Sequence, residues 1–181
     1  MKKTVYLISA ASVLLTVVSI VLYCCLKMDA AYSFAVTFGT TAYHFMMRLA
    51  VGGIIDTFMQ NHADYSKRWY QCRPWETRLY KRLHIQQWKH WIPSFQPDYF
   101  DPKKHSWDEI AQAMCQAELV HEVNVILSFL PVVFSYWFGA LAVFIVTSLL
   151  AALFDMIFVI MQRYNRPRIL RLIQKKKDEK S

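Results

Sequence analysis

Glycine, proline and cysteine are all scarce in this chain of 181 residues, and each shortage excludes a class of protein. Four Gly and six Pro exclude collagen-like and low-complexity chains, and the sequence contains no glycine-rich loop for a nucleotide cofactor. The spacing of the four cysteines fits neither a disulfide framework nor a zinc site: they are Cys24, Cys25, Cys72 and Cys115. We interpret them as small apolar residues or free thiols and expect no metal.

Acidic residues are also few, with 13 Asp and Glu against 21 Lys and Arg, which gives a formal net charge of +8. Hydrophobic residues nevertheless make up 55% of the chain, and this content excludes intrinsic disorder. A soluble basic domain would mix charges along its length, whereas here apolar and basic residues occupy separate blocks. The separation predicts an integral membrane protein, built as one all-α membrane domain over residues 1–181.

Four apolar segments approach the length of about 20 helical residues that crosses a hydrocarbon core of roughly 30 Å. We predict four transmembrane helices at about 4–26, 31–55, 118–135 and 140–162, the last two joined by a turn near Gly139. Because two lysines precede the first segment, a cleaved signal peptide is the alternative there. We favour a retained anchor, since the run exceeds the usual signal core of about 7–15 residues and no good cleavage site follows it.

The distribution of basic residues predicts the orientation in the membrane. Two Lys precede the first span, nine Lys or Arg lie in residues 57–117 and eight follow residue 162. Of the 21 basic residues, only Lys27 and Arg48 lie elsewhere. Because cytoplasmic loops are enriched in Lys and Arg, we expect a multi-pass cell-membrane protein with both termini cytoplasmic.

Residues 57–117 interleave Trp and Tyr with Lys and Arg, as is typical of a segment lying in the lipid headgroup layer. Single-stranded nucleic acid is the alternative anion for such a pattern. With four spans around the segment, membrane lipid is the favoured partner, and we expect no nucleic acid.

Helix-start and helix-break residues divide this predicted cytoplasmic segment into short helices. Pro74 predicts a helix start, and Ser106 with Glu109 predicts a capping box for a helix that continues into the third span. The basic tail, residues 163–181, predicts a short amphipathic helix on the cytoplasmic leaflet or a solvated end. Breaks are predicted at Pro93, Pro97 and Pro102.

Two ionisable residues lie at matching depth in different spans. Arg48 stands eight residues before Asp56 in the second span, and Asp155 stands eight residues before Arg163 in the fourth. At 1.5 Å per residue both lie about 12 Å from the cytoplasmic face, so we predict an ion pair between them. The pair is either a structural staple or part of an active site. His44 lies one turn from Arg48 and is a candidate third member.

The densest polar cluster is Glu118, His121 and Glu122, which share one side of a helix at the start of the third span. A carboxylate next to an imidazole orients it and favours its protonated form, as general-base catalysis requires. We therefore predict catalytic roles for His121 and Glu118. Two other interpretations stay open: a metal-ligand pair, although the motif is not repeated on a second helix, and interfacial charges that only end a helix.

A second polar motif lies at the end of the fourth span. It contains Arg163, Tyr164, Asn165, Arg166 and Arg168. Three Arg and an Asn beside an acid–base pair are suited to bind a phosphate or a carboxylate. We predict these residues, together with Glu122, as substrate-binding residues.

Two motifs about 40 residues apart resemble signatures of the glycosyl-4,4'-diaponeurosporenoate acyltransferase family. They are Ala117-Glu118-Leu119-Val120-His121 and Gln162-Arg163-Tyr164-Asn165-Arg166-Pro167-Arg168-Ile169. An upstream segment of the family is similar to Trp75-Glu76, Leu79-Tyr80, Ile85 and Trp88-Lys89 before Ile92-Pro93, and the resemblance covers residues 66–173. This family carries out the last step of staphyloxanthin-type carotenoid synthesis. The resemblance therefore implies transfer of a fatty acyl group to the 6-hydroxyl of a glucose esterified to a C30 carotenoid acid.

The resemblance implies an acyl donor, acyl-CoA or acyl carrier protein, a glycosylated lipid acceptor and no bound cofactor. We expect His121 to deprotonate the sugar hydroxyl, and Arg163, Asn165 or Arg166 to stabilise the oxyanion or hold the donor's phosphates. Because Glu122 stands where the family has an aromatic residue, another glycolipid acceptor stays open. The alternative functions are a small membrane methyltransferase or reductase, and a non-catalytic lipid-binding membrane protein.

Overall fold

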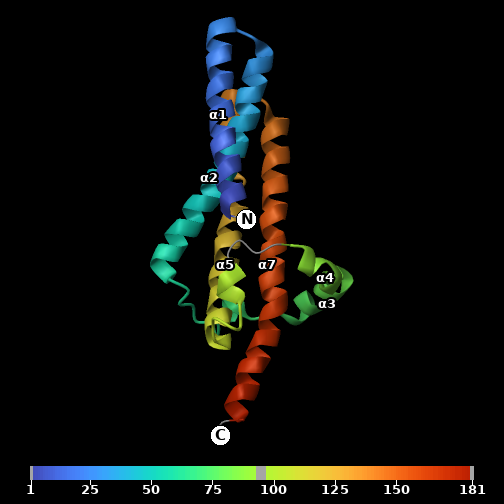
Figure 1. Cartoon of the computed structure of the whole chain (residues 1–181). Helices are drawn as coiled ribbons and strands as arrows, with labels where there is room; N and C mark the ends of the chain where they lie inside the picture. The colour runs from blue at the N-terminus through green and yellow to red at the C-terminus, as the bar shows by residue number, and fades with distance from the viewer. Residues whose placement is uncertain (1, 93–96, 180–181) are drawn as a thin grey trace. The chain divides into compact units, whose positions relative to one another are not determined.

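The computed structural model describes residues 2–92 and 97–179, and these residues form helices and connecting turns with no strand (Figure 1). The long helices are α1 (Lys2–Leu26), α2 (Asp29–Met59), α5 (Trp107–Leu127), α6 (Leu130–Phe138) and α7 (Leu141–Asp178). The short ones are η1 (Arg68–Tyr70), α3 (Pro74–Arg82), α4 (Ile85–Trp88), η2 (Lys89–Trp91) and η3 (Pro97–Phe100). The all-α prediction is confirmed.

Three helical stretches are long and apolar enough to cross a membrane: Lys3–Leu26, Trp107–Phe138 and Leu141–Asp178. They coincide with the first, third and fourth predicted spans and identify the chain as a membrane protein. Within the described chain α2 is not among them, although it has 31 residues, because its Thr, Tyr, His and Arg residues dilute its apolar content. The fourth crossing therefore stays a prediction.

The third span is interrupted between α5 and α6 by a proline. Pro131 lies in the first turn of α6 and has no N–H to donate to the carbonyl of Leu127, four residues earlier. That carbonyl accepts a hydrogen bond from the hydroxyl of Tyr43 instead, at 2.9 Å. The break thus fixes a contact between α2 and the α5–α6 junction.

The turn predicted near Gly139 is confirmed. Gly139 ends α6 with a φ of 64°, in the left-handed region that glycine adopts without steric cost, and its N–H bonds the carbonyl of Ser135 at 2.9 Å. Ala140 follows with a φ of 51°, and α7 begins at the next residue.

Two helix starts predicted within residues 57–117 are also confirmed. Pro74 opens α3, and α5 begins after a reciprocal capping box. In that box Glu109 N–H donates to Ser106 Oγ at 3.3 Å, and Ser106 N–H donates to Glu109 Oε2 at 2.7 Å. Of the predicted breaks, Pro97 begins η3, Pro102 lies in the turn that follows, and Pro93 lies outside the described residues.

The tail differs from the prediction of a separate short helix, because α7 continues through Pro167 to Asp178. A proline inside a helix removes one backbone hydrogen bond. Here contacts on both sides of Pro167 hold the helix together, since Arg166 before it and Ile173 after it are both buried, at 1% and 5% exposure.

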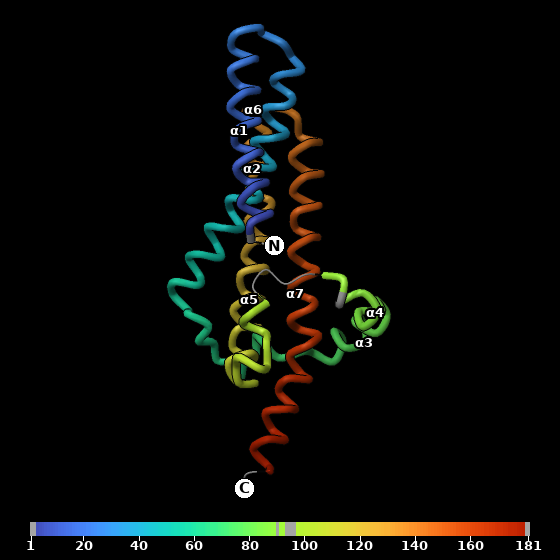
Figure 2. Tube along the Cα trace, in the orientation of Figure 1, coloured from blue at the N-terminus to red at the C-terminus, as the bar shows by residue number. Residues whose placement is uncertain are grey.

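The chain forms two compact units, and α5 and α7 contribute residues to both along the trace of Figure 2. We call Gly53–Glu122 with Met156–Ser181 the motif unit, and Lys2–Gly52 with Val123–Asp155 the helix-bundle unit. The motif unit contains the two sequence motifs. The helix-bundle unit contains Arg48 and Asp155.

Candidate functional site

Glu118 connects the two motifs inside the motif unit. Its side chain is fully buried on α5, and Oε1 accepts a hydrogen bond from Arg163 Nη1 at 2.6 Å. Oε2 accepts from Arg166 Nη2, on the same face of α7. Two stretches more than 40 residues apart in sequence therefore meet in a pair of buried salt bridges.

A second carboxylate, Glu76 of α3, binds the other edge of Arg163. Arg163 Nε donates to Glu76 Oε2 at 2.9 Å and Nη2 donates to Oε1 at 2.8 Å, a bidentate geometry. The hydroxyl of Tyr80, one turn along α3, donates to Oε2 at 3.1 Å. Burial acts to raise the pKa of Glu76, but the hydrogen bonds and charge of Arg163 outweigh it and leave the pKa below its ordinary value. Glu76 is therefore a charged, buried partner.

Backbone carbonyls of the η1 segment complete the contacts of both arginines. Arg163 Nη1 donates to the carbonyl of Trp69 at 3.0 Å, and Nη2 donates to that of Gln71 at 3.2 Å. Arg166 Nη1 donates to the carbonyl of Tyr70 at 2.5 Å, and its guanidinium lies 5.3 Å from the centre of the Tyr70 ring. The two arginines thus anchor three consecutive residues to α7.

We call Glu76, Glu118, Arg163 and Arg166 the arginine–glutamate cluster. Its formal charges cancel, as buried charges require. All three guanidinium nitrogens of Arg163 bind a carboxylate, and both terminal ones also bind a carbonyl, so the contacts described match its five N–H donors. An anion could reach Arg163 only by displacing one of these partners, and the substrate-binding roles of Arg163 and Arg166 stay predictions.

His121 lies one turn after Glu118 and is half-buried. Its ring stacks on Phe158 of α7, with centroids 4.6 Å apart and an interplanar angle of 10°. Both carboxylate oxygens of Glu118 bind arginines, so the role of Glu118 in orienting His121 stays a prediction. Glu122 accepts a hydrogen bond from Trp69 Nε1 at 2.8 Å. Among the residues that the structure describes, no group of three His, Cys, Asp or Glu is arranged to hold a metal ion.

Lys89 joins the second motif to the end of α4. Its Nζ donates to Asn165 Oδ1 at 2.9 Å and lies 5.0 Å from the centre of the Tyr164 ring. Tyr164 in turn packs edge-on against Tyr80, with centroids 6.0 Å apart. Burial, and secondarily the charge of the exposed Arg168, lower the pKa of Lys89. A half-buried ammonium with three donors and one described hydrogen-bond acceptor is a candidate anion ligand.

Glu76 and Lys89 belong to this site although no sequence motif predicts a site role for them. A signal for Glu76 was present, because it is the one acidic residue among the nine of α3 and follows the helix-opening Pro74 by two positions. Lys89 lacked such a signal, since it is one of nine basic residues in a segment whose charges also serve the membrane surface.

The predicted ion pair of the helix-bundle unit is confirmed. Arg48 Nη2 and Asp155 Oδ2 lie 2.5 Å apart, and Asp155 is fully buried. Arg48 also donates to the carbonyls of His44 at 2.7 Å and Ala151 at 2.9 Å, while Asn124 Nδ2 donates to Asp155 Oδ1 at 3.2 Å. The pair joins α2, α5 and α7.

Several buried polar atoms around this pair lack a hydrogen-bond partner among the described residues. Both ring nitrogens of His44 are among them, and His44 is 4% exposed. Arg48 Nε, Asn124 Oδ1 and Ser148 Oγ share this property. Because buried polar groups are costly unless they are hydrogen-bonded, the surroundings of His44 favour a polar group of a ligand or a water molecule.

Comparison with known proteins places the chain in a family. No curated protein and no solved structure matches the chain. A sequence profile of glycosyl-4,4'-diaponeurosporenoate acyltransferase matches residues 66–175, which is more than half of the chain. The matched range contains the whole arginine–glutamate cluster, His121 and Lys89. The chain therefore belongs to the glycosyl-4,4'-diaponeurosporenoate acyltransferase family.

Proposed function

We propose that this protein is a membrane acyltransferase that esterifies a fatty acyl group onto a sugar hydroxyl of a glycosylated carotenoid or related isoprenoid lipid. One observation carries the proposal: the segment that matches the family folds so that its two motifs meet in the buried arginine–glutamate cluster. Two carboxylates and two guanidinium groups, of which Glu76, Glu118 and Arg166 are buried, are held together one helical turn from the imidazole of His121. Such an arrangement is typical of a site that handles protons and developing charge.

His121 is the proposed general base. Its imidazole accepts the proton of the sugar hydroxyl while the hydroxyl oxygen attacks the carbonyl carbon of the acyl thioester. The tetrahedral intermediate then collapses, the C–S bond breaks and the leaving thiolate takes the proton back from the imidazolium. The products are the ester and the free thiol, and His121 is returned to its starting form. Stacking on Phe158 supports the proposal, since it restricts the orientation of the ring.

The proposed donor is acyl-CoA or acyl carrier protein, and both carry phosphate groups. We assign phosphate binding first to Lys89, Asn165 and Arg168, because the donors of Arg163 are engaged within the arginine–glutamate cluster. Arg163 and Arg166 then position η1 and α3 against α5 and α7. No bound cofactor is needed for this acyl transfer.

The test is acyl transfer by the purified protein in nanodiscs, supplied with labelled acyl-CoA and a glycolipid extract. We expect His121→Ala to lower kcat by roughly 10²–10⁴-fold, the usual contribution of general acid–base catalysis. The matched control is His62→Ala, because His62 is exposed in the same unit and should tolerate the change.

Near-normal transfer by a correctly inserted His121→Ala protein would refute the base assignment. A product that requires S-adenosylmethionine or a nicotinamide, or lipid binding without turnover, would refute the acyltransferase proposal itself.

A further inference from the structure

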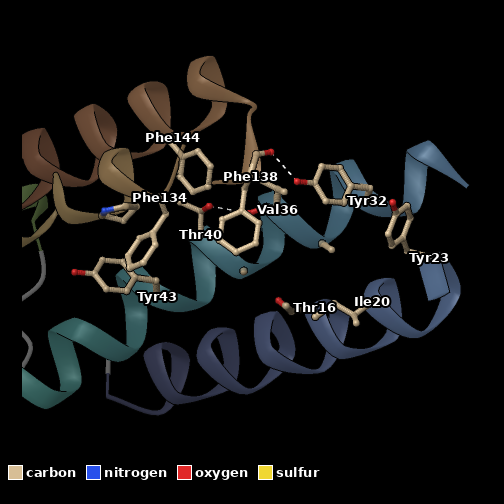
Figure 3. Close-up of a pocket in the computed structure, with 13 residues that line it drawn as sticks. Thr16, Ile20, Tyr23, Tyr32, Val36, Thr40, Tyr43, Phe134, Phe138 and Phe144 are labelled. Carbon is tan, nitrogen blue, oxygen red and sulfur yellow. Dashed lines mark hydrogen bonds between the residues drawn. The ribbon is translucent and has the colours of Figure 1, made fainter. Parts of the chain in front are cut away.

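The helix-bundle unit contains a partly open cavity of about 440 Å³ (Figure 3). This volume lies within the range of roughly 300–1,000 Å³ that is usual for small-molecule sites. Residues of α1, α2, α6 and the start of α7 line the cavity, and the rings of Phe134, Phe138 and Phe144 form much of one wall. It lies outside the segment that matches the family, apart from the part contributed by α6 and α7.

The wall offers little to a polar ligand, because four of the five hydroxyl groups among its lining residues are already engaged. Four lining hydroxyls donate to backbone carbonyls: Thr16 to Ser12 at 2.7 Å, Tyr32 to Phe138 at 2.6 Å, Thr40 to Val36 at 2.7 Å and Tyr43 to Leu127 at 2.9 Å. Apart from the hydroxyl of Tyr23, the remaining lining surface is mostly methyl, methylene and ring carbon. A hydrocarbon chain is the ligand that gains most from such a wall.

The length of the cavity favours a flexible chain over a rigid one. Its lining residues on α2 run from Tyr32 to Tyr43, which is about 16 Å along the helix axis at 1.5 Å per residue. This is about half of the roughly 30 Å hydrocarbon core of a bilayer. A saturated acyl chain can bend or end within this length, whereas a rigid polyene long enough to span the bilayer cannot.

The two ends of the cavity differ in chemistry. At one end the rings of Tyr23 and Tyr32 pack with centroids 5.3 Å apart. At the other end Tyr43 packs edge-on against His44, with centroids 5.4 Å apart, and neither nitrogen of that buried imidazole has a described partner. His44 contacts the lining residue Tyr43 and is not itself a lining residue. Since a neutral imidazole has one N–H to donate, an acceptor such as a thioester carbonyl is favoured near this end.

We propose that this cavity binds the fatty acyl chain of the donor, with the carbonyl end toward Tyr43 and His44 and the methyl end toward Tyr23 and Tyr32. The identification of the chain as the donor's rests on the proposed function. The existence of a hydrocarbon-binding site rests on the wall alone.

The first test fills the cavity and measures acyl-chain selectivity. Ala35 lines the cavity and is half-buried, so Ala35→Phe places a ring inside it. For every two methylene groups of the acyl chain that the ring keeps out of the cavity, kcat/KM for long-chain acyl-CoA should fall by roughly tenfold. The kcat/KM for shorter-chain acyl-CoA should fall less. Ala142→Phe is the matched control, since Ala142 is exposed on α7 in the same unit and does not line the cavity. Unchanged chain-length selectivity in Ala35→Phe would overturn the proposal.

The second test measures binding without transfer, by photolabelling with acyl-CoA that carries a diazirine at a chosen carbon. A diazirine at the methyl end should label peptides with Tyr23 or Tyr32, and one beside the carbonyl should label peptides with Tyr43 or Phe134. Ala35→Phe should reduce both labels. The reverse pattern would overturn the orientation.

The outcomes separate the two proposals. Labelling of these peptides in a protein that transfers no acyl group would keep the site and refute the acyltransferase function. Transfer with labelling confined to other peptides would refute the site. Equal labelling by a photoactivatable phosphatidylcholine would show that ordinary membrane lipid fills the cavity. Labelling that is reduced by an isoprenoid lipid but not by fatty acyl-CoA would show that the cavity binds the acceptor's chain. Either result would overturn the proposal.

Discussion

Glu118 is the residue on which the contacts of the motif unit converge, because each of its oxygens binds a different arginine. Removing one partner of a buried ion pair leaves an uncompensated charge and costs roughly 3–5 kcal/mol. We therefore expect Glu118→Gln to lower the free energy of unfolding by about this amount. The measurement is thermal unfolding in detergent, followed by circular dichroism.

The control for this experiment is Glu179→Gln, since Glu179 is exposed near the end of the tail and should unfold like the parent protein. A Glu118→Gln protein with the parent's unfolding temperature would show that the arginines find other partners. Loss of acyl transfer without loss of stability would assign Glu118 to catalysis, as the sequence motif predicts.

Glu118 and Asp155 differ in whether their ion-pair partners can be predicted from the sequence. The Arg48–Asp155 pair was predictable because a charge in an apolar helix needs a partner at its own depth, and the chain offers few. Around Glu118 many basic residues compete, and the choice of Arg163 and Arg166 depends on how α5 and α7 are rotated against each other. The relative rotation of the two helices cannot be deduced from the spacing of residues along the sequence.

At the scale of the element, α3 presents two faces of opposite character. Glu76 and Tyr80 are buried on one side, whereas Trp75 is 53% exposed and Leu79 is 39% exposed on the other. Exposed apolar side chains on a basic helix favour contact with lipid at the headgroup level. We infer that α3 lies against the membrane surface through Trp75 and its neighbours.

The prediction for α3 is measured by quenching of tryptophan fluorescence with brominated lipids in nanodiscs. If Trp75 lies in the headgroup layer, Trp75→Phe should lower the quenched fraction of the emission. Trp107→Phe is the comparison, because Trp107 is half-buried at the start of α5 and should contribute less. Equal quenching in the parent protein and Trp75→Phe would place α3 away from lipid.

Local signals predicted helix starts well and helix ends less well. Pro74 and the Ser106–Glu109 capping box act within one turn, so the sequence nearby is sufficient to predict them. Around Pro167 of α7, Arg166 binds Tyr70 and Glu118, which are distant in sequence, and Ile173 is buried. Tertiary contacts of this kind override a local break and are invisible in a local pattern.

For the whole molecule, the open question is whether α2 crosses the membrane. Four crossings place both termini and residues 57–117 on the cytoplasmic side, in agreement with the distribution of Lys and Arg. With α2 outside the bilayer, three crossings would place the N-terminus and residues 57–117 on opposite sides, so that either the nine basic residues of this segment or Lys2 and Lys3 would lie outside the cell. We therefore expect α2 to cross, with its Arg48 charge compensated by Asp155.

Protease protection of epitope tags tests this topology. Tags at the two ends should both be protected in intact right-side-out vesicles and digested only after lysis. A third tag, inserted between Gly139 and Ala140, should be digested in intact vesicles, because four crossings place the α6–α7 turn outside. With three crossings and a cytoplasmic N-terminus, the C-terminal tag and the turn tag both change sides. With three crossings and an external N-terminus, only the N-terminal tag changes sides. Digestion of either terminal tag in intact vesicles would therefore refute the four-span topology. Digestion of the C-terminal tag together with protection of the turn tag would also refute the assignment of Lys89 and Arg168 to a donor supplied from the cytoplasm.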